Sequence, residues 1–531
     1  MAGREGPYRR DYNSTNYTHP NEENINNLHR AMDYNNFGQP VVRTVNYNIF
    51  GQNNTTAFGE LSVQETTPVI QQHFIYGIDP REVKAETLGD AEITTPDGIL
   101  QLNSGTGPVT YSIVRSGEFL ASRCGQGVIS RFSVRFDQGI VGTQQRAGLL
   151  SFEEALCVGY NGTEFGVLHQ HDKKNYIHKF VVTTAPSGSE TVTITLDGVE
   201  YDITINATTI NNGVAQLFSQ FPRGLWAAEA SDGEIYFVYF NNGNAPTTSD
   251  FSITSTGTLS GTSVTVRDAD FGTETWIPQN SWNVDPLDGT GTSGIVIDPS
   301  KFNSFQISFH WLGSGTIQYA VESPTGDFIV FHQIPWTNLH TSLSLMNPSF
   351  SVGFFCVNQT GASGSSVNMY GGSYFGGIQG KVVQNKLPSS ANNTITTNLT
   401  SNTVHHLGTL RNPLYYSGII NTSEFKLKKL SLAFQGNDPL ELLVYINQPL
   451  ATGSQVFNQY PGIKATASLV AGTISGTAMP AASYIIPING NAIIDLSELN
   501  LIITPESTFT VGVRSGQTIS RVTAGLIWVE E

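Results

Sequence analysis

The sequence has little charge, and this scarcity sets it apart from most soluble proteins. Only 13% of its 531 residues are Asp, Glu, Lys or Arg, about half of the ~25% that is usual. Asn, Ser, Thr, Gly and Gln take their place, and these residues suit turns and strand faces better than helix interiors. The net charge of −16 argues against nucleic acid or an anionic membrane as the main partner, because both attract a basic face.

Cysteines and long hydrophobic runs are scarce too. Cys124, Cys157 and Cys356 are too few for a disulfide scaffold, and we interpret all three as buried strand residues. No apolar run approaches the ~18–20 residues of a membrane span, and the N-terminal stretch lacks the apolar core of a signal peptide. These absences predict a protein that is made in a reducing cytoplasm and does not insert into a membrane.

Residues 1–50 are rich in Asn and Tyr and show little apolar periodicity. Their arginines are matched by acidic residues, so this is not a basic nucleic-acid tail. Five tyrosines are many for a purely solvating segment, and an aromatic-bearing arm can become ordered by docking on a neighbour. We expect an N-terminal docking arm at 1–50, with a disordered N-terminus as the alternative.

Short segments with a two-residue period dominate residues 51–179 and again residues 269–383. In Val128–Phe136 every second residue is apolar or small and faces one side, which is typical of a half-buried antiparallel strand. Gly159–Leu168 is expected to form a hairpin, with Asn161 and Gly162 as the turn. We interpret the two stretches as the first and second parts of one β-sandwich domain.

Residues 180–268 have a different character and are expected to form an inserted ββαββ domain. Two alternating strands flank Asp197-Gly198, a strong signal for a two-residue hairpin. Apolar residues at helical spacing then predict a short helix over 213–221, ended by Pro222. Two more strands, 234–240 and 250–254, complete the unit.

The polar stretch 384–402 shows no apolar periodicity and is the best candidate for a linker. Residues 403–531 contain a further set of alternating segments, such as Phe425–Phe434 and Leu440–Ile446, and are expected to form a C-terminal β-sandwich domain. The fold class is therefore mainly β: several β-sandwich or jelly-roll domains, a small inserted α+β domain and an extended N-terminal arm.

Two motifs suggest ligand chemistry. His169 and His171 would face the same way on a strand, with Asp172 and His178 nearby, and two imidazoles can share a metal. Because no third ligand follows at a fixed spacing, a solvated strand end is the stronger interpretation. The segment 288–294 contains G-x-G-x-x-G, but β-branched residues and Pro299 follow it where a phosphate site needs a helix.

Glycoside cleavage would need two carboxylates placed across a sugar groove. The candidates are Glu153, Glu154, Asp285, Asp288 and Glu322, which the sequence cannot pair. The tryptophans nearby are better interpreted as core residues than as a sugar platform, and they are Trp276, Trp282, Trp311 and Trp336. No nucleophile elbow or zinc-protease motif is present. We therefore assign no catalytic, cofactor-binding or metal-binding residue, and expect a protein that is not an enzyme and uses no cofactor.

Several sequence blocks resemble successive parts of a virion structural protein of tailed bacteriophages, with relatives in large DNA viruses. The blocks are 32–43, 57–63, 124–132, 159–167, 311–317, 322–326 and 346–350. The unit 180–268 is similar to a small domain that recurs in phage tail and fibre proteins. This resemblance spans roughly residues 32–380 and implies no catalytic residues.

The sequence therefore predicts a non-enzymatic component of a virus particle, such as a tailed-phage fibre, spike or other appendage on tail or capsid. Its expected partners are other virion proteins and further copies of itself, with a trimer favoured, and a host surface glycan is a further candidate. It would be located in the virion after assembly in the host cytoplasm. A capsid-building or capsid-decorating subunit and a glycan-binding module or depolymerase are the alternatives.

Overall fold

The computed structural model describes residues 32–34, 40–42, 66–122, 124–240, 246, 250–270, 272–359, 364–380, 386–396, 399–453, 455–459, 463–499 and 501–531. The chain divides into two compact units, Met1–Glu65 and Thr66–Glu531. In the first unit, β1 (Met32–Tyr34) pairs antiparallel with β2 (Pro40–Val42). Most of the predicted docking arm lies outside the described residues, so its docking role stays a prediction.

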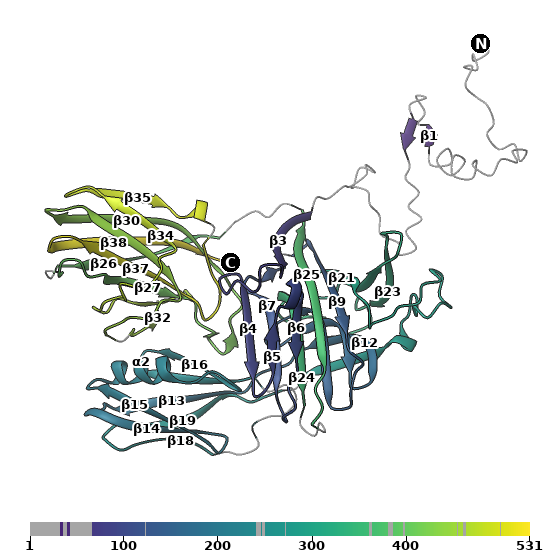
Figure 1. Ribbon diagram of the computed structural model, residues 1–531, viewed down its shortest axis with the longest axis horizontal. Helices are drawn as coiled ribbons and strands as arrows, with labels where there is room; N and C mark the ends of the chain where they lie inside the picture. The colour runs from purple at the N-terminus through teal and green to yellow at the C-terminus, as the bar shows by residue number, and fades with distance from the viewer. Residues whose placement is uncertain are drawn as a thin grey trace, which may run out of the picture. The chain divides into compact units, whose positions relative to one another are not determined.

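Two eight-stranded sheets of the second unit form a sandwich that we call the body (Figure 1). Strand β8 (Leu120–Ala121) pairs with β24 beside the main path of the first sheet. The other strands of this sheet are hydrogen-bonded to one another in the order β20 (Thr273–Pro278), β12 (Glu164–His171), β11 (Ala155–Asn161), β10 (Thr143–Leu150), β24 (Ser349–Asn358), β7 (Tyr111–Ser116) and β4 (Val83–Leu88).

The second sheet of the body is built around the longest of its strands, β25. Strand β3 (Thr66–His73) pairs with residues 373–379 of β25, beyond the part of β25 that pairs with β6. Along the main path of this sheet the strands are β23 (Phe328–Ile334), β22 (Ile317–Glu322), β21 (Asn303–His310), β9 (Gly127–Phe136), β25 (Asn368–Gln379), β6 (Leu100–Asn103) and β5 (Glu92–Thr94).

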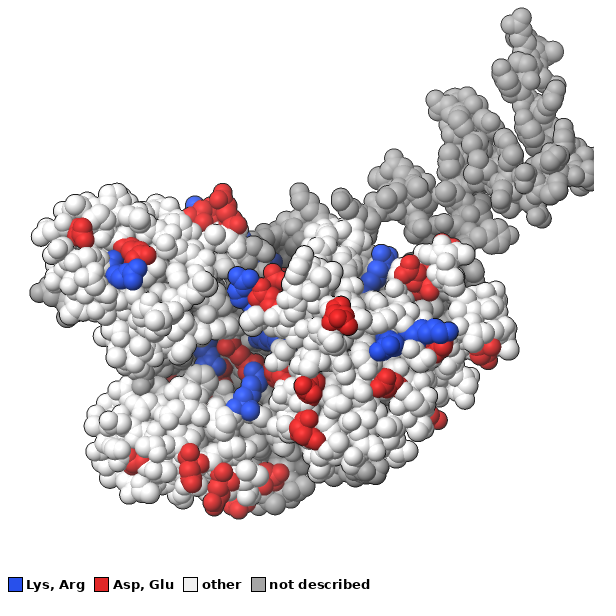
Figure 2. Space-filling view, viewed as in Figure 1, with Lys and Arg blue, Asp and Glu red and all other residues white. Residues whose placement is uncertain are grey.

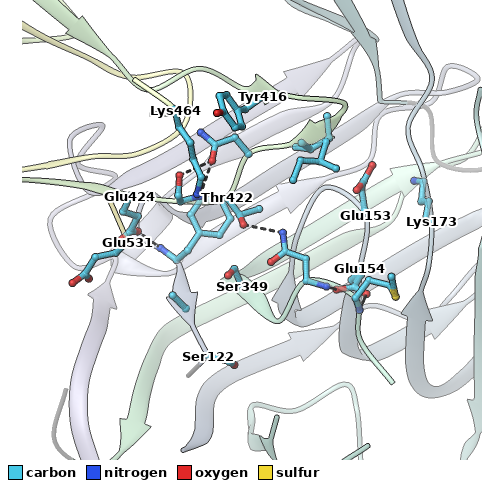
Figure 3. Close-up of a pocket in the computed structure, with 18 of the residues that line it drawn as sticks. Ser122, Glu153, Glu154, Lys173, Ser349, Tyr416, Thr422, Glu424, Lys464 and Glu531 are labelled. Carbon is cyan, nitrogen blue, oxygen red and sulfur yellow. Dashed lines mark hydrogen bonds between the residues drawn. The ribbon is translucent and has the colours of Figure 1, made fainter. Parts of the chain in front are cut away.

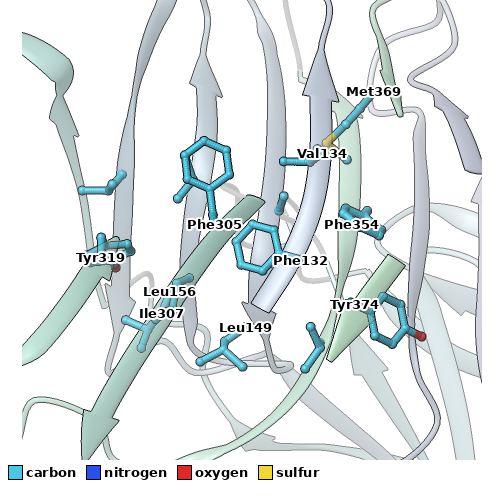
Figure 4. Packing of buried hydrophobic residues seen from close by; sticks show 14 of the residues in the cluster. Phe132, Val134, Leu149, Leu156, Phe305, Ile307, Tyr319, Phe354, Met369 and Tyr374 are labelled. Carbon is cyan, nitrogen blue, oxygen red and sulfur yellow. The ribbon is translucent and has the colours of Figure 1, made fainter. Parts of the chain in front are cut away.

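Apolar side chains of both sheets meet in one core (Figure 4). Phe132 and Phe305 come from the second sheet and stack at a centroid distance of 6.0 Å, while Leu149 and Phe354 come from the first. The alternation predicted for Val128–Phe136 is confirmed, because Arg131 is exposed while the apolar residues of that strand are buried. The two-residue period therefore places one face of each strand in the sandwich core.

Residues 177–267 form two small sheets and one helix, which we call the insertion. Its core contains Phe180, Val192, Ile194 and Phe237. The strands of the first sheet are β16 (Trp226–Ser231), β17 (Glu234–Tyr239), β13 (Ile177–Thr184) and β19 (Ser260–Arg267). Those of the second are β15 (Val199–Ala207), β14 (Gly188–Leu196) and β18 (Phe251–Ser255). The expected ββαββ set is thus joined by three further strands, β13, β16 and β19.

The helix and hairpin of the insertion follow local signals. Helix α2 spans Ile210–Gln220, three residues earlier than expected, because the side chain of Thr209 accepts a hydrogen bond from Asn212 N and caps the N-terminus. In the hairpin, Asp197 and Gly198 have φ of 55° and 78°, as a type I′ turn requires. In the body hairpin β11–β12, Asn161 pairs with Glu164, so the turn lies one residue later than predicted.

The strands after residue 387 form a second sandwich, which we call the C-terminal lobe. One sheet has the order β26 (Pro388–Ile395), β38 (Ile519–Glu530), β30 (Phe425–Gly436) and β35 (Asn491–Asp495), with β36 (Ile502–Ile503) also on β30. The other has the order β32 (Asn458–Gln459), β33 (Thr466–Ser468), β27 (His405–Arg411), β37 (Thr508–Ser515), β31 (Leu440–Ile446) and β34 (Ala482–Ile486).

A short hairpin and three single turns of 3-10 helix complete the described elements. The hairpin pairs β28 (Tyr415–Tyr416) with β29 (Ile419–Ile420). The 3-10 turns are η1 (Pro96–Gly98), η2 (Gln279–Ser281) and η3 (Ser497–Leu499). No helix in the described part of the chain is long and apolar enough to cross a membrane.

Two further expectations need correction. Residues 388–395, inside the expected linker 384–402, form the edge strand β26, because an edge strand needs only a half-buried face and Ala391 and Ile395 supply it. Cys124 is exposed in the turn before β9, whereas Cys157 and Cys356 are buried in strands as expected. The limits of the predicted domains stay predictions.

Candidate functional site

His169 and His171, two of the histidines singled out in the sequence, are packing residues of the body. The rings of His169 and His171 stack at 4.6 Å, and both lie nearly perpendicular to the ring of Trp336. The Nε2 atom of His169 lies 3.0 Å from the carbonyl oxygen of Ser344. Burial lowers the pKa of His169 to about 4, which keeps this imidazole neutral near pH 7. Among the described residues no three His, Cys, Asp or Glu side chains come together as a metal site.

His178 lies in the insertion, away from this pair. Its Nε2 is 2.8 Å from the hydroxyl of Ser263, and its ring stacks on Phe251 at 4.2 Å. Burial lowers the pKa of His178 to about 4. The three histidines of the sequence motif are therefore divided between two cores.

The glycine-rich loop 288–294 is a closed turn. Asp288 bridges to Val296, and the buried carboxylate of Asp285 accepts hydrogen bonds from Leu287 N at 2.9 Å and Ser293 N at 2.8 Å. These hydrogen bonds help to hold the pKa of Asp285 below its usual value despite burial. Both aspartates therefore shape the turn. Glu322, another of the candidate carboxylates, lies at the exposed end of β22.

Charged side chains gather instead where the body, the insertion and the C-terminal lobe meet (Figure 2). Arg223 of the insertion lies 2.8 Å from the carboxylate of Glu506 in the C-terminal lobe and 3.4 Å from that of Glu86 in the body. Lys84 of the body donates a hydrogen bond of 2.7 Å to the carbonyl oxygen of Pro505. Burial lowers the pKa of Lys84 to about 8. One cationic side chain thus joins three lobes.

A second charged contact joins the insertion to the C-terminal lobe. Arg411 and Glu229 are 3% and 2% exposed, and their side chains approach to 3.1 Å. The guanidinium also lies 4.0 Å from the ring centre of Phe218 and 5.2 Å from that of Phe457. Such a pair is held by its desolvated hydrogen bonds, and removing one partner leaves the other charge buried.

A cavity of about 780 Å³ lies at this junction (Figure 3). Nearly half of its lining residues are charged, whereas 13% of the chain is. The basic residues are Lys173, Lys174, Arg267, Lys386, Lys426 and Lys464, and the acidic ones are Glu153, Glu154, Asp172, Glu424 and Glu531. The cavity therefore carries both signs of charge in almost equal number.

Two carboxyl groups of the cavity have strongly raised pKa values. Glu154 is buried and accepts hydrogen bonds from Met346 N at 2.5 Å and Asn347 N at 2.9 Å. Its burial nevertheless raises its pKa to about 7. Glu424 accepts a hydrogen bond from Phe119 N, and burial raises its pKa to about 8. Carboxyl groups of this kind can donate a proton near neutral pH.

Ion pairs line the rest of the cavity. Arg267 of the insertion pairs with Glu153 of the body, and Lys426 lies 2.6 Å from the carboxylate of Glu531. Burial lowers the pKa of Lys173 to about 8. The cavity can therefore hold a small polar or zwitterionic molecule, and its walls come from all three lobes.

The structure brings together only part of the residues named from the sequence. Glu153 and Glu154 line the cavity, but Asp285, Asp288 and Glu322 do not. Trp282 and Trp336 are buried, as expected for core residues. The sequence analysis did not identify Glu424, Lys173 and Lys464 as cavity residues. These residues lie far apart in the chain, so no spacing pattern links them. The only signal for each was that it is charged in a chain with few charged residues.

Comparisons with known proteins leave the family open. No family model matches the chain, and no curated protein matches it. Solved structures with distant similarity include the cellulose-induced protein Cip1, at 8% identity and a TM-score of 0.26, over 58% of this chain and 96% of that one. A lectin from Bauhinia forficata in complex with GalNAc matches at 10% identity and a TM-score of 0.21, over 58% and 97%.

A third match is an archaeal virus protein described by its triple jelly-roll fold and turret assembly. Its identity is 9% and its TM-score 0.16, over 85% of this chain and 89% of that one. Scores this low carry no argument about function. The fold class, a mainly β protein built of β-sandwiches with a small α+β insertion, rests on the sheets themselves.

Proposed function

We propose that this protein is a non-enzymatic structural component of a virus particle, of the fibre, spike or appendage type found in tailed phages. The observation that carries the proposal is where the resembling blocks fall in the fold. Blocks 124–132, 159–167, 311–317, 322–326 and 346–350 contribute to or adjoin β9, the β11–β12 hairpin, β21, β22, β23 and β24, all in the body. Segments far apart in the chain thus belong to one sandwich.

The charged junction supports a structural role. Arg223, Arg411 and Arg267 each bind a carboxylate of another lobe. Such contacts hold the lobes in fixed positions. An appendage that transmits force or position needs lobes that are held in this way. Residues 1–50, which belong to the N-terminal unit Met1–Glu65, are the proposed attachment arm to other virion proteins.

The direct test is the composition of purified virus particles. Mass spectrometry should find this chain in intact particles, and antibody labelling in electron micrographs should place it on an appendage. Label over the whole shell would favour the capsid-building alternative. Absence of the chain from intact particles, together with its presence in the infected cell, would refute the virion proposal.

A glycan-binding or depolymerising role is the second candidate, and the cavity is the observation that favours it. Glu154 and Glu424 supply two carboxyl groups with pKa values of about 7 and 8 in one cavity, and perturbed carboxyls are common at functional sites. The test is to incubate the protein and the E154Q and E424Q variants with host surface polysaccharide. Wild-type binding or shortening that both variants lose would support this role, and no effect on any glycan would remove it.

A further inference from the structure

A smaller hollow of about 100 Å³ lies on the outer face of the first body sheet. Its residues come mainly from β4, β7, β10, β11, β12 and β24, whose alternating neighbours Val114, Leu149 and Phe354 face the sandwich core. Of the described residues that line it, four are basic and one is acidic: Arg115, Arg146, Lys173 and Arg223 against Glu86. We call it the basic hollow, because positive charge gathers there in a chain whose net charge is −16.

Arg115 is buried in the wall of the basic hollow, yet no described residue accepts a hydrogen bond from its guanidinium. This residue is 6% exposed. Its ion pair with Glu86 spans 3.6 Å, beyond hydrogen-bonding distance, and Glu86 also lies 3.4 Å from Arg223. A guanidinium has five N–H donors, and a buried donor without an acceptor costs free energy. The donors of Arg115 are therefore available to a ligand.

The sheet register explains why Arg115 lacks an acceptor. On one side Lys84 of β4 lies opposite it and is itself a cation. On the other side Gly353 of β24 lies opposite it, and Gly148 of β10 follows on the next strand. Because neither glycine has a side chain, neither position supplies an acceptor or fills space beside the guanidinium.

Arg146, which lines the same hollow, shows how the chain satisfies another buried guanidinium. It is 3% exposed and donates hydrogen bonds to the side chains of Gln144 at 2.9 Å and Gln170 at 3.1 Å. Its guanidinium also lies 3.2 Å from the carboxylate of Glu274. Three side chains thus serve Arg146, whereas Arg115 shares one more distant carboxylate.

Aromatic rings surround these charged groups. The rings that line the hollow are Tyr111, Phe152, Phe240 and Phe355. The guanidinium of Arg115 lies 4.9 Å from the ring centre of Phe152, which stacks on Phe240 at 5.5 Å. Apolar surroundings strengthen the attraction between opposite charges, because they replace water of high dielectric constant. The side chain of Arg223 is 38% exposed, so part of the basic lining is in contact with solvent.

We propose that the basic hollow binds the oxyanion group of a small ligand, a carboxylate, sulfate or phosphate, through the guanidinium of Arg115. The planar guanidinium matches two oxygens of such a group and binds them with two parallel hydrogen bonds. An anion there would also offset the excess of positive charge that the basic residues create. The inference goes beyond the proposed function, because it requires no role in a virion. The hollow is also distinct from the cavity of Glu154 and Glu424, although Lys173 lines both.

The test is isothermal titration calorimetry of the purified full-length protein with sodium phosphate, sodium sulfate, sodium acetate and glucuronic acid. Ionic strength is held constant with chloride, and glucose is the uncharged control. The wild type should bind at least one of these anions saturably. R115M should weaken this binding by on the order of 10- to 100-fold. R115K keeps the charge but loses the planar fork, and it should weaken binding less.

The identity of the anion that binds separates two sources of the ligand. Binding of phosphate or sulfate would identify a free inorganic ion. Binding of glucuronic acid without binding of acetate or of the inorganic ions would identify an acidic sugar. Either result supports the proposal if R115M weakens it.

The matched control is R131M, because Arg131 is an exposed arginine on the other sheet of the body. It donates a hydrogen bond of 2.9 Å to Gln306 and lies over the ring of Phe328. R131M and R115M change the net charge equally, so a general charge effect would weaken binding in both. R131M should bind the anion as the wild type does, and circular dichroism should show that each variant folds.

Three results would overturn the proposal. They are the absence of saturable binding of every anion, equal weakening by R131M and R115M, and glucose binding as tight as that of glucuronic acid. Unchanged affinity in R115M would overturn it as well. If R115M does not fold, R115K takes its place in each comparison.

Discussion

The buried pair between Arg411 and Glu229 gives the sharpest quantitative expectation. Replacing Arg411 by Met keeps an unbranched apolar side chain beside Phe218 and Phe457 but removes the guanidinium that lies over these rings and opposite Glu229. The carboxylate then stays buried, with Leu414 N at 2.8 Å and Ala230 N at 3.1 Å as its remaining donors. Breaking a buried pair in this way costs about 3–5 kcal/mol, or roughly 100- to 4,000-fold in an unfolding equilibrium.

The matched control is R514M, because Arg514 forms an equally direct ion pair in an exposed position. Its side chain lies 2.6 Å from Glu441, with exposed fractions of 39% and 31%. An exposed pair of this kind contributes only ~0.2–1 kcal/mol. The same substitution therefore compares a buried guanidinium with an exposed one.

The assay is urea unfolding followed by tryptophan fluorescence, with limited proteolysis to detect separation of the insertion from the C-terminal lobe. R411M should lower the midpoint of the first transition far more than R514M. Adding E229Q to R411M should restore part of the loss, because the amide keeps an acceptor without burying a charge. If R411M costs no more than R514M, the junction is not held by this pair and the reasoning fails.

Three further outcomes can be measured in the same way. Since the carboxyl of Glu424 has a folded pKa of about 8 against 4.5 unfolded, the folded chain holds its proton between those values. Stability should then fall as pH rises from about 5 to 8, by up to ~1.4 kcal/mol per pH unit, and E424Q should reduce this slope; an unchanged slope would contradict the assignment. His178 has the opposite effect, because its folded pKa is about 4 against 6.5 in the unfolded chain. Its contribution to the free energy of unfolding is lost as pH falls from 6.5 to 4. Thermal unfolding should therefore show a smaller loss of stability for H178F than for the wild type over that range. Gly353→Ala should abolish soluble expression of the folded body, because the new Cβ would lie 2.3 Å from the carbonyl oxygen of Val114, whereas Gly476→Ala, with open space around it, should express normally; equal yields would refute this account of packing in β24.

Much of the fold could be predicted because its signals are local. The alternation in Leu440–Ile446 predicted a strand with the observed bounds, and Asp197-Gly198 predicted the observed turn. The sequence of residues 388–395 predicted a linker because its half-buried face carries only two apolar residues, Ala391 and Ile395, and the strand also depends on pairing with β38.

The candidate site was largely beyond prediction for a related reason. Glu153 and Glu154 were identified as carboxylates, but nothing local indicates that Glu424 lies in the same cavity. Burial sets the pKa of Glu424, and the backbone of Phe119 supplies its hydrogen bond. Such a contact is a property of packed lobes, which no short stretch of sequence encodes.

The pairing of β12 with β20 has a consequence for the order of folding. These adjacent strands of the body are separated in sequence by the whole insertion, with His171 opposite Thr273. Closing a flexible loop of roughly 100 residues costs about 4 kcal/mol in chain entropy. If the insertion folds first, the bridge between Lys174 and Asp270, which flank the insertion, brings the two strands together. The insertion then acts as an internal clamp that speeds completion of the body sheet, and destabilising its core should slow the folding of a lobe that it does not belong to.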